Sequence, residues 1–233
     1  MQTRTSKLTL PLLKSAVDDM PQTIADRTRR VYDRLALVYP ASTFFFHSRA
    51  HQEAIQVCGI HDGMRVLEVA TGSGEMFRRL VRMNPTGSTI GLDLSPNMAA
   101  RTQRRVQTVF PDVSAHCKAV DCRYMPFRDE SFDAVVCCYL LELLSGDDII
   151  QTLLEIRRVL RPGAPFTLVM IGQNTEVFNQ LYRVAGKLAP AFWGRQVEER
   201  VPELIESIDF RITTDRHVRQ TGYPSRVLTA RKL

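Results

Sequence analysis

The feature that most constrains the fold is a regular alternation, beginning at residue 64, in which short apolar runs are followed by stretches of helical periodicity. Continuous apolar runs predict strands buried on both faces, and apolar residues three and four apart predict helices that pack on them. The predicted strands are 64–70, 88–94, 113–120, 132–140 and 164–172, with an antiparallel pair in 210–232; the predicted helices are 75–83, 95–110, 147–160 and 175–188. This pattern indicates one α/β domain with a doubly wound, mostly parallel sheet.

The turn between the first predicted strand and helix, within "VLEVATGSGEM" at residues 66–76, is the expected ligand site. In such sheets, ligands bind outside the carboxyl ends of the strands, and glycines let the backbone approach them closely. A dinucleotide fingerprint would have a third glycine where this chain has Phe77, and no G-K-[ST] follows for a phosphate-binding loop. The turn therefore predicts a nucleoside ligand without phosphates on the helix, and disfavours a dehydrogenase.

Three acids lie in or just after successive predicted strands. Asp93 ends the second strand and could accept hydrogen bonds from both ribose hydroxyls. Asp121, or the backbone of its loop, could reach an adenine amino group, while Met125 covers the ring. Glu68 lies inside the first strand, where a charge is unfavourable unless it is paired. Either a ligand ammonium group or the backbone amides of the turn could pair it.

Four motifs occur in order between residues 64 and 172: "EVATGSG", "GLDLSPNM", "VDCRYMPFRDESFDAVVCCYLLELL" and "EIRRVLRPGAPF". Together they resemble the class I S-adenosylmethionine-dependent methyltransferases, in particular the ubiquinone/menaquinone C-methyltransferases and the bacterial phospholipid N-methyltransferases. The resemblance implies a Rossmann-like fold with a seven-stranded, mostly parallel sheet, and S-adenosyl-L-methionine as cofactor. The cofactor-binding residues that it implies are Glu68, Ala70, Thr71, Gly72, Gly74, Asp93, Leu94, Asp121, Cys122, Cys138 and Tyr139.

The sequence departs from the family pattern in two places. The family often has glycine where this chain has Ala70. The quinone branch usually has an Arg-Asn pair after the fourth strand, where this chain has "LLELL". The first departure resembles the quinone branch, in which "ATG" turns occur, whereas the second does not resemble it.

The chain is expected to divide into an N-terminal helical lid or substrate segment, residues 1–60, and a cofactor-binding domain, residues 61–233. In this fold, acceptor specificity usually comes from the N-terminal helices and the segment after the fifth strand, here 20–55 and 173–205. Both are rich in apolar and aromatic residues. Most of these are expected to pack as a lid, and the alternative is a pocket for a small apolar or amphipathic acceptor such as a lipid, a quinone-like ring or a secondary metabolite.

A general base is needed only if the acceptor must lose a proton during methyl transfer. The candidates are Tyr39, His47 and His51, followed by Glu142. His47 and His51 lie four residues apart on one helix face, but no third metal ligand is evident and HExxH fails at Ser48. We therefore expect no metal site, and a role on the helix surface for the pair.

The net charge and the cysteines indicate which partners and which cellular compartment to expect. The formal net charge is +6, and the arginines fall mainly on predicted helices, where solvated faces are the expected role. No nucleic-acid partner is expected, and peripheral contact with an anionic membrane is the alternative. Five cysteines without a C-x-x-C pair favour a reducing, cytoplasmic location, with contact at the inner membrane face left open. An RNA or protein methyltransferase and a non-catalytic partner protein are the alternative functions.

Overall fold

The computed structural model describes residues 49–172, 197–220 and 224–233. Tyr39, His47, the predicted helix 175–188 and most of the 1–60 segment lie outside the described residues.

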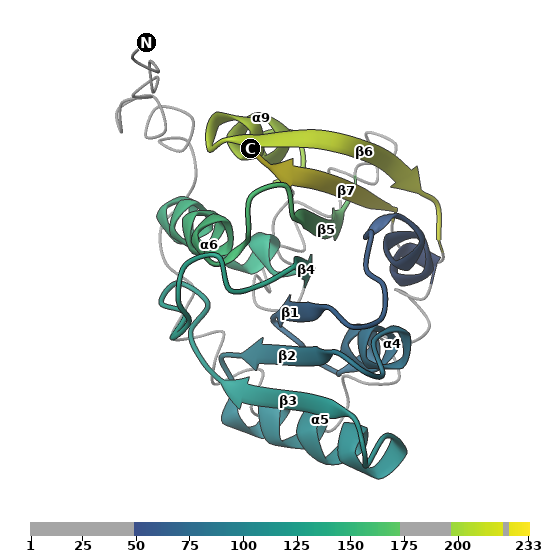
Figure 1. Cartoon of the computed structure of the whole chain (residues 1–233). Coiled ribbons are helices and arrows are strands. Elements are labelled where there is room, and N and C mark those ends of the chain that lie inside the picture. Colours follow the sequence, from purple (N-terminus) through teal and green to yellow (C-terminus); the bar gives the residue numbers. More distant parts are fainter. Residues whose placement is uncertain (1–48, 173–196, 221–223) are drawn as a thin grey trace.

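The described chain forms a seven-stranded sheet in the order β3-β2-β1-β4-β5-β7-β6 (Figure 1). The strands are β1 (Arg65–Val69), β2 (Ser88–Asp93), β3 (Ser114–Ala119), β4 (Ala134–Cys138), β5 (Pro165–Ile171), β6 (Phe210–Val218) and β7 (Ser225–Lys232). Strands β1 to β5 are parallel to one another, and β7 runs antiparallel between β5 and β6. The predicted α/β sheet and its antiparallel end are confirmed.

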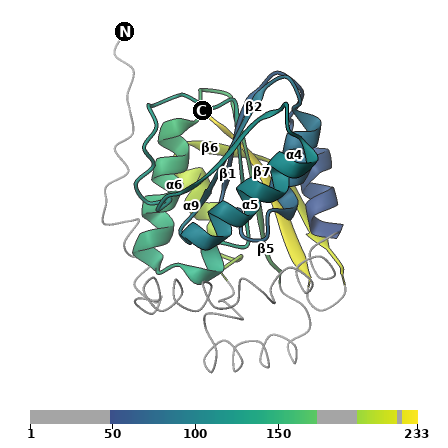
Figure 2. The same cartoon turned by 90° about the horizontal axis from the view of Figure 1, so that it is seen from below.

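Helices cover both faces of this sheet (Figure 2). They are α4 (Glu75–Met83), α5 (Pro96–Val109), α6 (Gly146–Val159), α9 (Val201–Ser207) and a helix over residues 49–57, with a short 3₁₀ helix, η1 (Leu141–Leu143), after β4. One face carries α6 and α9, which pack against β4 and β5 in the largest core cluster; the other carries α4, α5 and the 49–57 helix.

Local sequence signals explain the helix starts. Ser95 precedes α5, and its Oγ accepts a hydrogen bond from the Met98 amide at 3.2 Å, with Pro96 as the first helical residue. Ser95 is therefore the N-cap of α5. The short α9 was not predicted: its seven residues include Pro202 and span too few turns for a clear period.

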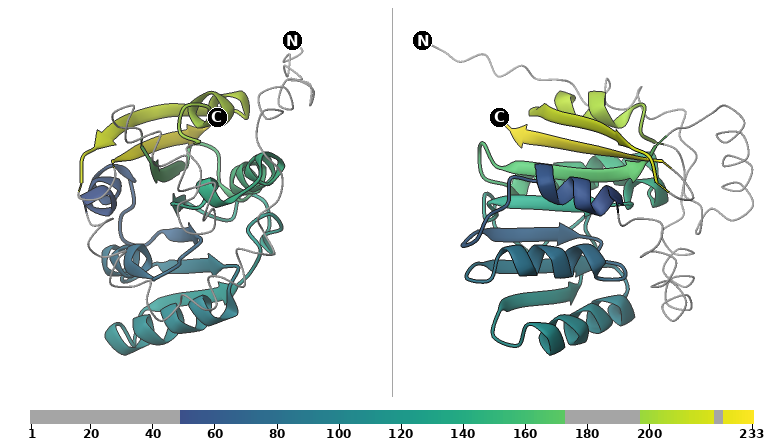
Figure 3. Two further views of the ribbon diagram at one scale, coloured as in Figure 1. Left: turned by 180° about the vertical axis from the view of Figure 1, so that it is seen from behind. Right: turned by 90° about the vertical axis from the view of Figure 1, so that its right-hand side faces the viewer.

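The 49–57 helix lies beside the β6–β7 hairpin (Figure 3). The Gln220 side chain accepts a hydrogen bond from the Ala50 amide at 3.2 Å, and Arg216 forms an ion pair with Glu53. Ala50 and Ala54 pack in the same cluster as Val169 and Val227 of the sheet. Among the described residues, no helix combines the length and apolar character required to cross a membrane.

Candidate active site at the carboxyl ends of the strands

The turn after β1 has an unusual backbone. Ala70, Gly72 and Gly74 have φ angles of 64°, 50° and 77°, the left-handed region that favours glycine. A Cβ added to Gly72 would have no heavy atom of the described residues within 4 Å, whereas one on Gly74 would lie 2.7 Å from Thr102 Oγ1 of α5. Gly72 therefore leaves room for a ligand, and Gly74 lets α5 pack closely. Ala70 adopts a conformation that favours glycine, although it carries a Cβ.

Glu68 is a buried carboxyl group without a complete set of partners. Its side chain is 1% exposed, and Oε2 has no hydrogen-bond partner among the described residues. Two of the turn amides, the other predicted partner of Glu68, donate to different acceptors: the Thr71 amide to Leu92 O and the Gly72 amide to Asp93. Burial, and secondly the nearby Asp93, raise the pKa of Glu68 well above its ordinary value. A ligand ammonium group therefore remains its predicted partner.

Asp93 fixes the turn to the end of β2. Its Oδ2 accepts a hydrogen bond from the Gly72 amide at 2.7 Å, and its Oδ1 accepts one from the Ser95 amide at 2.9 Å. A carboxylate can accept about four hydrogen bonds, so these two do not by themselves exhaust its capacity for ribose hydroxyls.

We expect Asp93→Asn to raise the Kd for S-adenosylhomocysteine about 10- to 100-fold, because an amide NH₂ would face one of these two backbone donors. Isothermal titration calorimetry measures the change. The control is Asp112→Asn at an exposed aspartate, which should bind as wild type. An unchanged Kd for the Asp93 variant would remove this residue from the site.

The two acids also select the charge of the ligand. Glu68 and Asp93 lie close enough to raise the pKa of Glu68 electrostatically. Such a site repels a pyrophosphate and favours a cation. S-adenosylmethionine carries an ammonium and a sulfonium group as well as a ribose, so the unpartnered Glu68 oxygen, the Asp93 carboxylate and the open space at Gly72 fit it.

Two further predicted cofactor residues differ in exposure. Thr71 is buried, and its Oγ1 lies 3.3 Å from Cys117 Sγ, so its hydroxyl also joins the turn to β3. Leu94, directly after β2, is 39% exposed. Their contacts with the cofactor remain predictions.

Asp121 is held by a residue that the sequence analysis did not select. Arg123 donates to Asp121 through Nε at 3.0 Å and Nη2 at 2.7 Å, and this pairing is the main reason that the pKa of Asp121 is lowered. The partly buried Cys122 lies with its Sγ 3.6 Å from Thr152 Oγ1, and Met125 is buried in the main core. The adenine contacts of this loop stay predictions.

The end of β4 lies in a buried hydrogen-bonded cluster. Tyr139 has a φ of 54°; its hydroxyl is 2.7 Å from Ser225 Oγ, and Gln220 Nε2 donates to both oxygens. His51 is only 4% exposed, with its ring 6.0 Å from that of Tyr139. The expected surface role for His51 is therefore wrong: the β6–β7 hairpin and β4 cover this helix face. Cys138, partly buried, precedes Tyr139.

A pair of buried acids lies nearby. Glu142 Oε1 accepts a hydrogen bond from the Ile171 amide at 2.6 Å, while Oε2 has no hydrogen-bond partner among the described residues. Burial raises the pKa of Glu142 to about 7, with a smaller contribution from Glu198. Glu198 is 2% exposed and was not predicted, because nothing in its local sequence signals burial.

Comparisons with known proteins bear on this arrangement. Residues 66–163 match a family model described as a methyltransferase domain. The chain is 29% identical over 168 residues to the 2-phytyl-1,4-naphtoquinone methyltransferase of Nostoc sp., which covers 68% of this chain and 72% of that protein. It is 28% identical over 184 residues to the demethylmenaquinone methyltransferase of Staphylococcus saprophyticus, covering 78% and 74%.

Solved structures share the fold at lower identity. The crystal structure of the cyclase SpnF matches with a TM-score of 0.75 and 17% identity, covering 91% of this chain and 98% of that one. The N-methyltransferase NodS from Bradyrhizobium japonicum, in complex with S-adenosyl-L-homocysteine, matches with a TM-score of 0.71 and 13% identity, covering 88% and 98%. At these identities the likeness concerns the fold alone.

Proposed function

We propose that this chain, as a class I S-adenosylmethionine-dependent methyltransferase, methylates a small apolar or amphipathic acceptor, such as a quinol ring or a lipid. The names of the two quinone-methylating relatives support this class of acceptor. The missing Arg-Asn pair after β4 leaves the exact acceptor open within the class.

The observation that carries the proposal is the pair of uncharged, partly buried side chains at the end of β4, Cys138 and Tyr139. Burial is the main cause that raises the pKa values of Cys138 and Tyr139, so both side chains are uncharged near pH 7. The hydroxyl of Tyr139 is already bonded to Ser225 and Gln220. Uncharged side chains at this strand end suit an apolar acceptor and help to exclude water from the transfer.

The cofactor supplies an electrophilic methyl group on a sulfonium, which is a good leaving group. The chain's own residues then mainly bind and orient: Glu68 pairs the ammonium, Asp93 holds the ribose, and the β4 end excludes water. If a carbon or oxygen acceptor must lose a proton, Glu142 suits the role of base, because its pKa is raised to about 7 and its Oε2 has no hydrogen-bond partner among the described residues. Tyr39, His47 and His51 remain the other candidates.

The proposal is tested with the purified full chain and radiolabelled S-adenosylmethionine. Separate reactions contain demethylmenaquinol in detergent micelles, phosphatidylethanolamine vesicles, transfer RNA or a peptide pool. We expect organic-phase label with the quinol or the lipid, above that of a reaction without protein. Label confined to RNA or peptide would overturn the proposal in favour of a macromolecular acceptor. No transfer to any acceptor, despite measured binding of S-adenosylhomocysteine, would favour a non-catalytic role.

A further inference from the structure

Polar side chains along α6 hold the loop between β3 and β4, residues 120–133. These side chains are spaced three or four residues apart and so lie on one face of the helix. They belong to Asp148, Gln151, Glu155 and Arg158. The loop contains Asp121 and Cys122, the residues assigned above to the adenine end of the cofactor.

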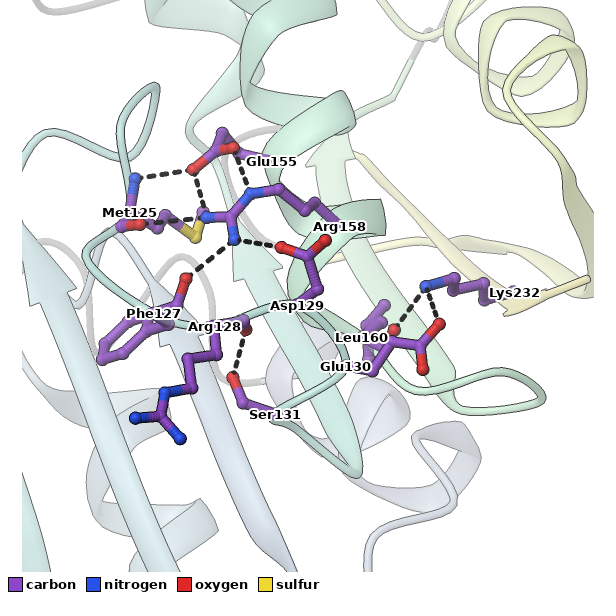
Figure 4. Close-up of polar contacts among 10 residues, drawn as sticks. All are labelled: Met125, Phe127, Arg128, Asp129, Glu130, Ser131, Glu155, Arg158, Leu160 and Lys232. Carbon is purple, nitrogen blue, oxygen red and sulfur yellow. Dashed lines mark hydrogen bonds and ion pairs between the residues drawn. The ribbon is translucent and has the colours of Figure 1, made fainter.

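Glu155 and Arg158 bind the backbone in the middle of this loop (Figure 4). Glu155 Oε2 accepts a hydrogen bond from the Met125 amide at 2.7 Å, and Arg158 Nη2 donates to the Met125 carbonyl at 3.0 Å. Arg158 Nη1 donates to the Phe127 carbonyl at 2.7 Å and to Asp129 Oδ1 at 2.8 Å. Both backbone polar groups of Met125 are thus bonded to one charged pair.

The pair is itself firmly joined. Arg158 Nε donates to Glu155 Oε1 at 2.6 Å, and Arg158 is the main cause that lowers the pKa of the Glu155 carboxyl. Their side chains are 31% and 13% exposed. Charge-assisted hydrogen bonds at partly buried positions are stronger than neutral ones, so this contact restricts the loop more than ordinary turn bonds would.

The same helix face reaches Asp121 through Arg123. Arg123 Nη1 donates to Asp148 Oδ1 at 2.7 Å, and Nη2 donates to Asp121 Oδ2 at the same distance. Gln151 donates to the Arg123 carbonyl at 3.2 Å. The loop is therefore bound to α6 from Asp121 to Asp129.

We propose that Glu155 and Arg158 are positioning residues for cofactor binding, which fix the backbone of Met125 and Phe127 and thereby place Asp121 and Cys122 against the adenine. The inference rests on the proposed function, since it takes the adenine to lie at that end of the loop. Neither residue contacts the reacting atoms, so the effect falls on cofactor affinity and leaves the chemical step unchanged.

The test compares Arg158→Met with Arg157→Met. Arg157 is the neighbouring arginine on α6; it pairs with Asp209 at 2.7 Å and has a similar side-chain exposure, 34% against 31%. We expect Arg158→Met to raise the Kd for S-adenosylhomocysteine and the KM for S-adenosylmethionine on the order of 10-fold, with kcat at saturation little changed. Arg157→Met should bind as wild type. Arg158→Lys keeps one donor group and should give an intermediate Kd, even if Arg158→Met fails to fold.

The outcomes separate the two proposals. A wild-type chain that does not bind S-adenosylhomocysteine contradicts the cofactor assignment itself. If the wild type binds S-adenosylhomocysteine and both Arg158 variants bind it with the same Kd, the positioning role alone is overturned. This holds even if the melting temperatures of the variants fall, because a purely structural ion pair would lower stability without changing the affinity of the folded chain. A lowered kcat with unchanged KM would also overturn it.

Discussion

A Glu68→Leu variant is expected to be more stable than the wild type and to lose most of its cofactor binding. Glu68 is 1% exposed, its Oε2 has no hydrogen-bond partner in the described part of the chain, and leucine fills a similar volume without a polar group. Removing an unsatisfied buried carboxyl should raise the free energy of unfolding by about 1–3 kcal/mol. Loss of a charge-assisted contact with the ligand ammonium should weaken cofactor binding by about 10- to 100-fold. Urea unfolding and calorimetry measure the two effects.

The stability difference should depend on pH in a fixed direction. The pKa of Glu68 in the folded chain is raised well above its ordinary value of 4.5, mainly by burial, so the folded state binds this proton more tightly than the unfolded state. The wild type therefore loses stability relative to Glu68→Leu as pH rises from 4.5 towards the folded pKa, and recovers it as pH falls through that window.

The control is Glu75→Leu. Glu75 is 5% exposed but forms ion pairs with Arg78 and Arg79, so its loss should destabilise the chain and leave cofactor affinity unchanged. If Glu68→Leu also lowered stability and bound the cofactor normally, the carboxyl would be satisfied within the chain and its assignment to the ligand would be wrong.

The second large effect is expected for Gly74→Ala. The added Cβ would lie 2.7 Å from Thr102 Oγ1 and 2.9 Å from its Cγ2, at a φ of 77°. Thr102 is 1% exposed and β-branched, so it has little freedom to move away. The clash and the backbone strain together should lower the free energy of unfolding by about 2–4 kcal/mol. They should also displace the turn that faces the cofactor, so calorimetry should detect little binding.

Gly163→Ala separates these two causes. Gly163 has a φ of 74°, but its added Cβ would meet no heavy atom within 4 Å, so only backbone strain of about 1 kcal/mol is expected. Equal losses in the two variants would show that close packing of α5 on the turn contributes nothing.

The sequence was informative wherever a local pattern decides the structure. Buried parallel strands are continuous apolar runs, and β1 and β5 were recognised as such. The cap at Ser95 has its own local signal, and the glycines of the first turn do adopt positive φ. The left-handed conformation of Ala70 was not foreseen, although the family's frequent glycine at that position was the clue.

What the sequence could not predict depends on contacts between distant residues. His51 is buried because Tyr139 lies against it, 88 positions later in the chain (139 − 51). The unpaired oxygen of Glu68 depends on where the turn amides point, which is a property of the folded backbone. The α6 contacts of the 120–133 loop join residues about 30 positions apart, so the motif "EIRRVLRPGAPF" contained Glu155 and Arg158 without indicating the loop that they contact.

The position of β7 between β5 and β6 has a consequence for synthesis of the chain on the ribosome. In the described sheet β6 pairs only with β7, and β7 is made after both of its neighbours. While β7 is still within the exit tunnel, β5 has an open edge and β6 has no strand to join, although the five parallel strands are already available to pair. The edge of β5 therefore stays open to other strands until β7 emerges. We expect aggregation through this edge during that interval of folding.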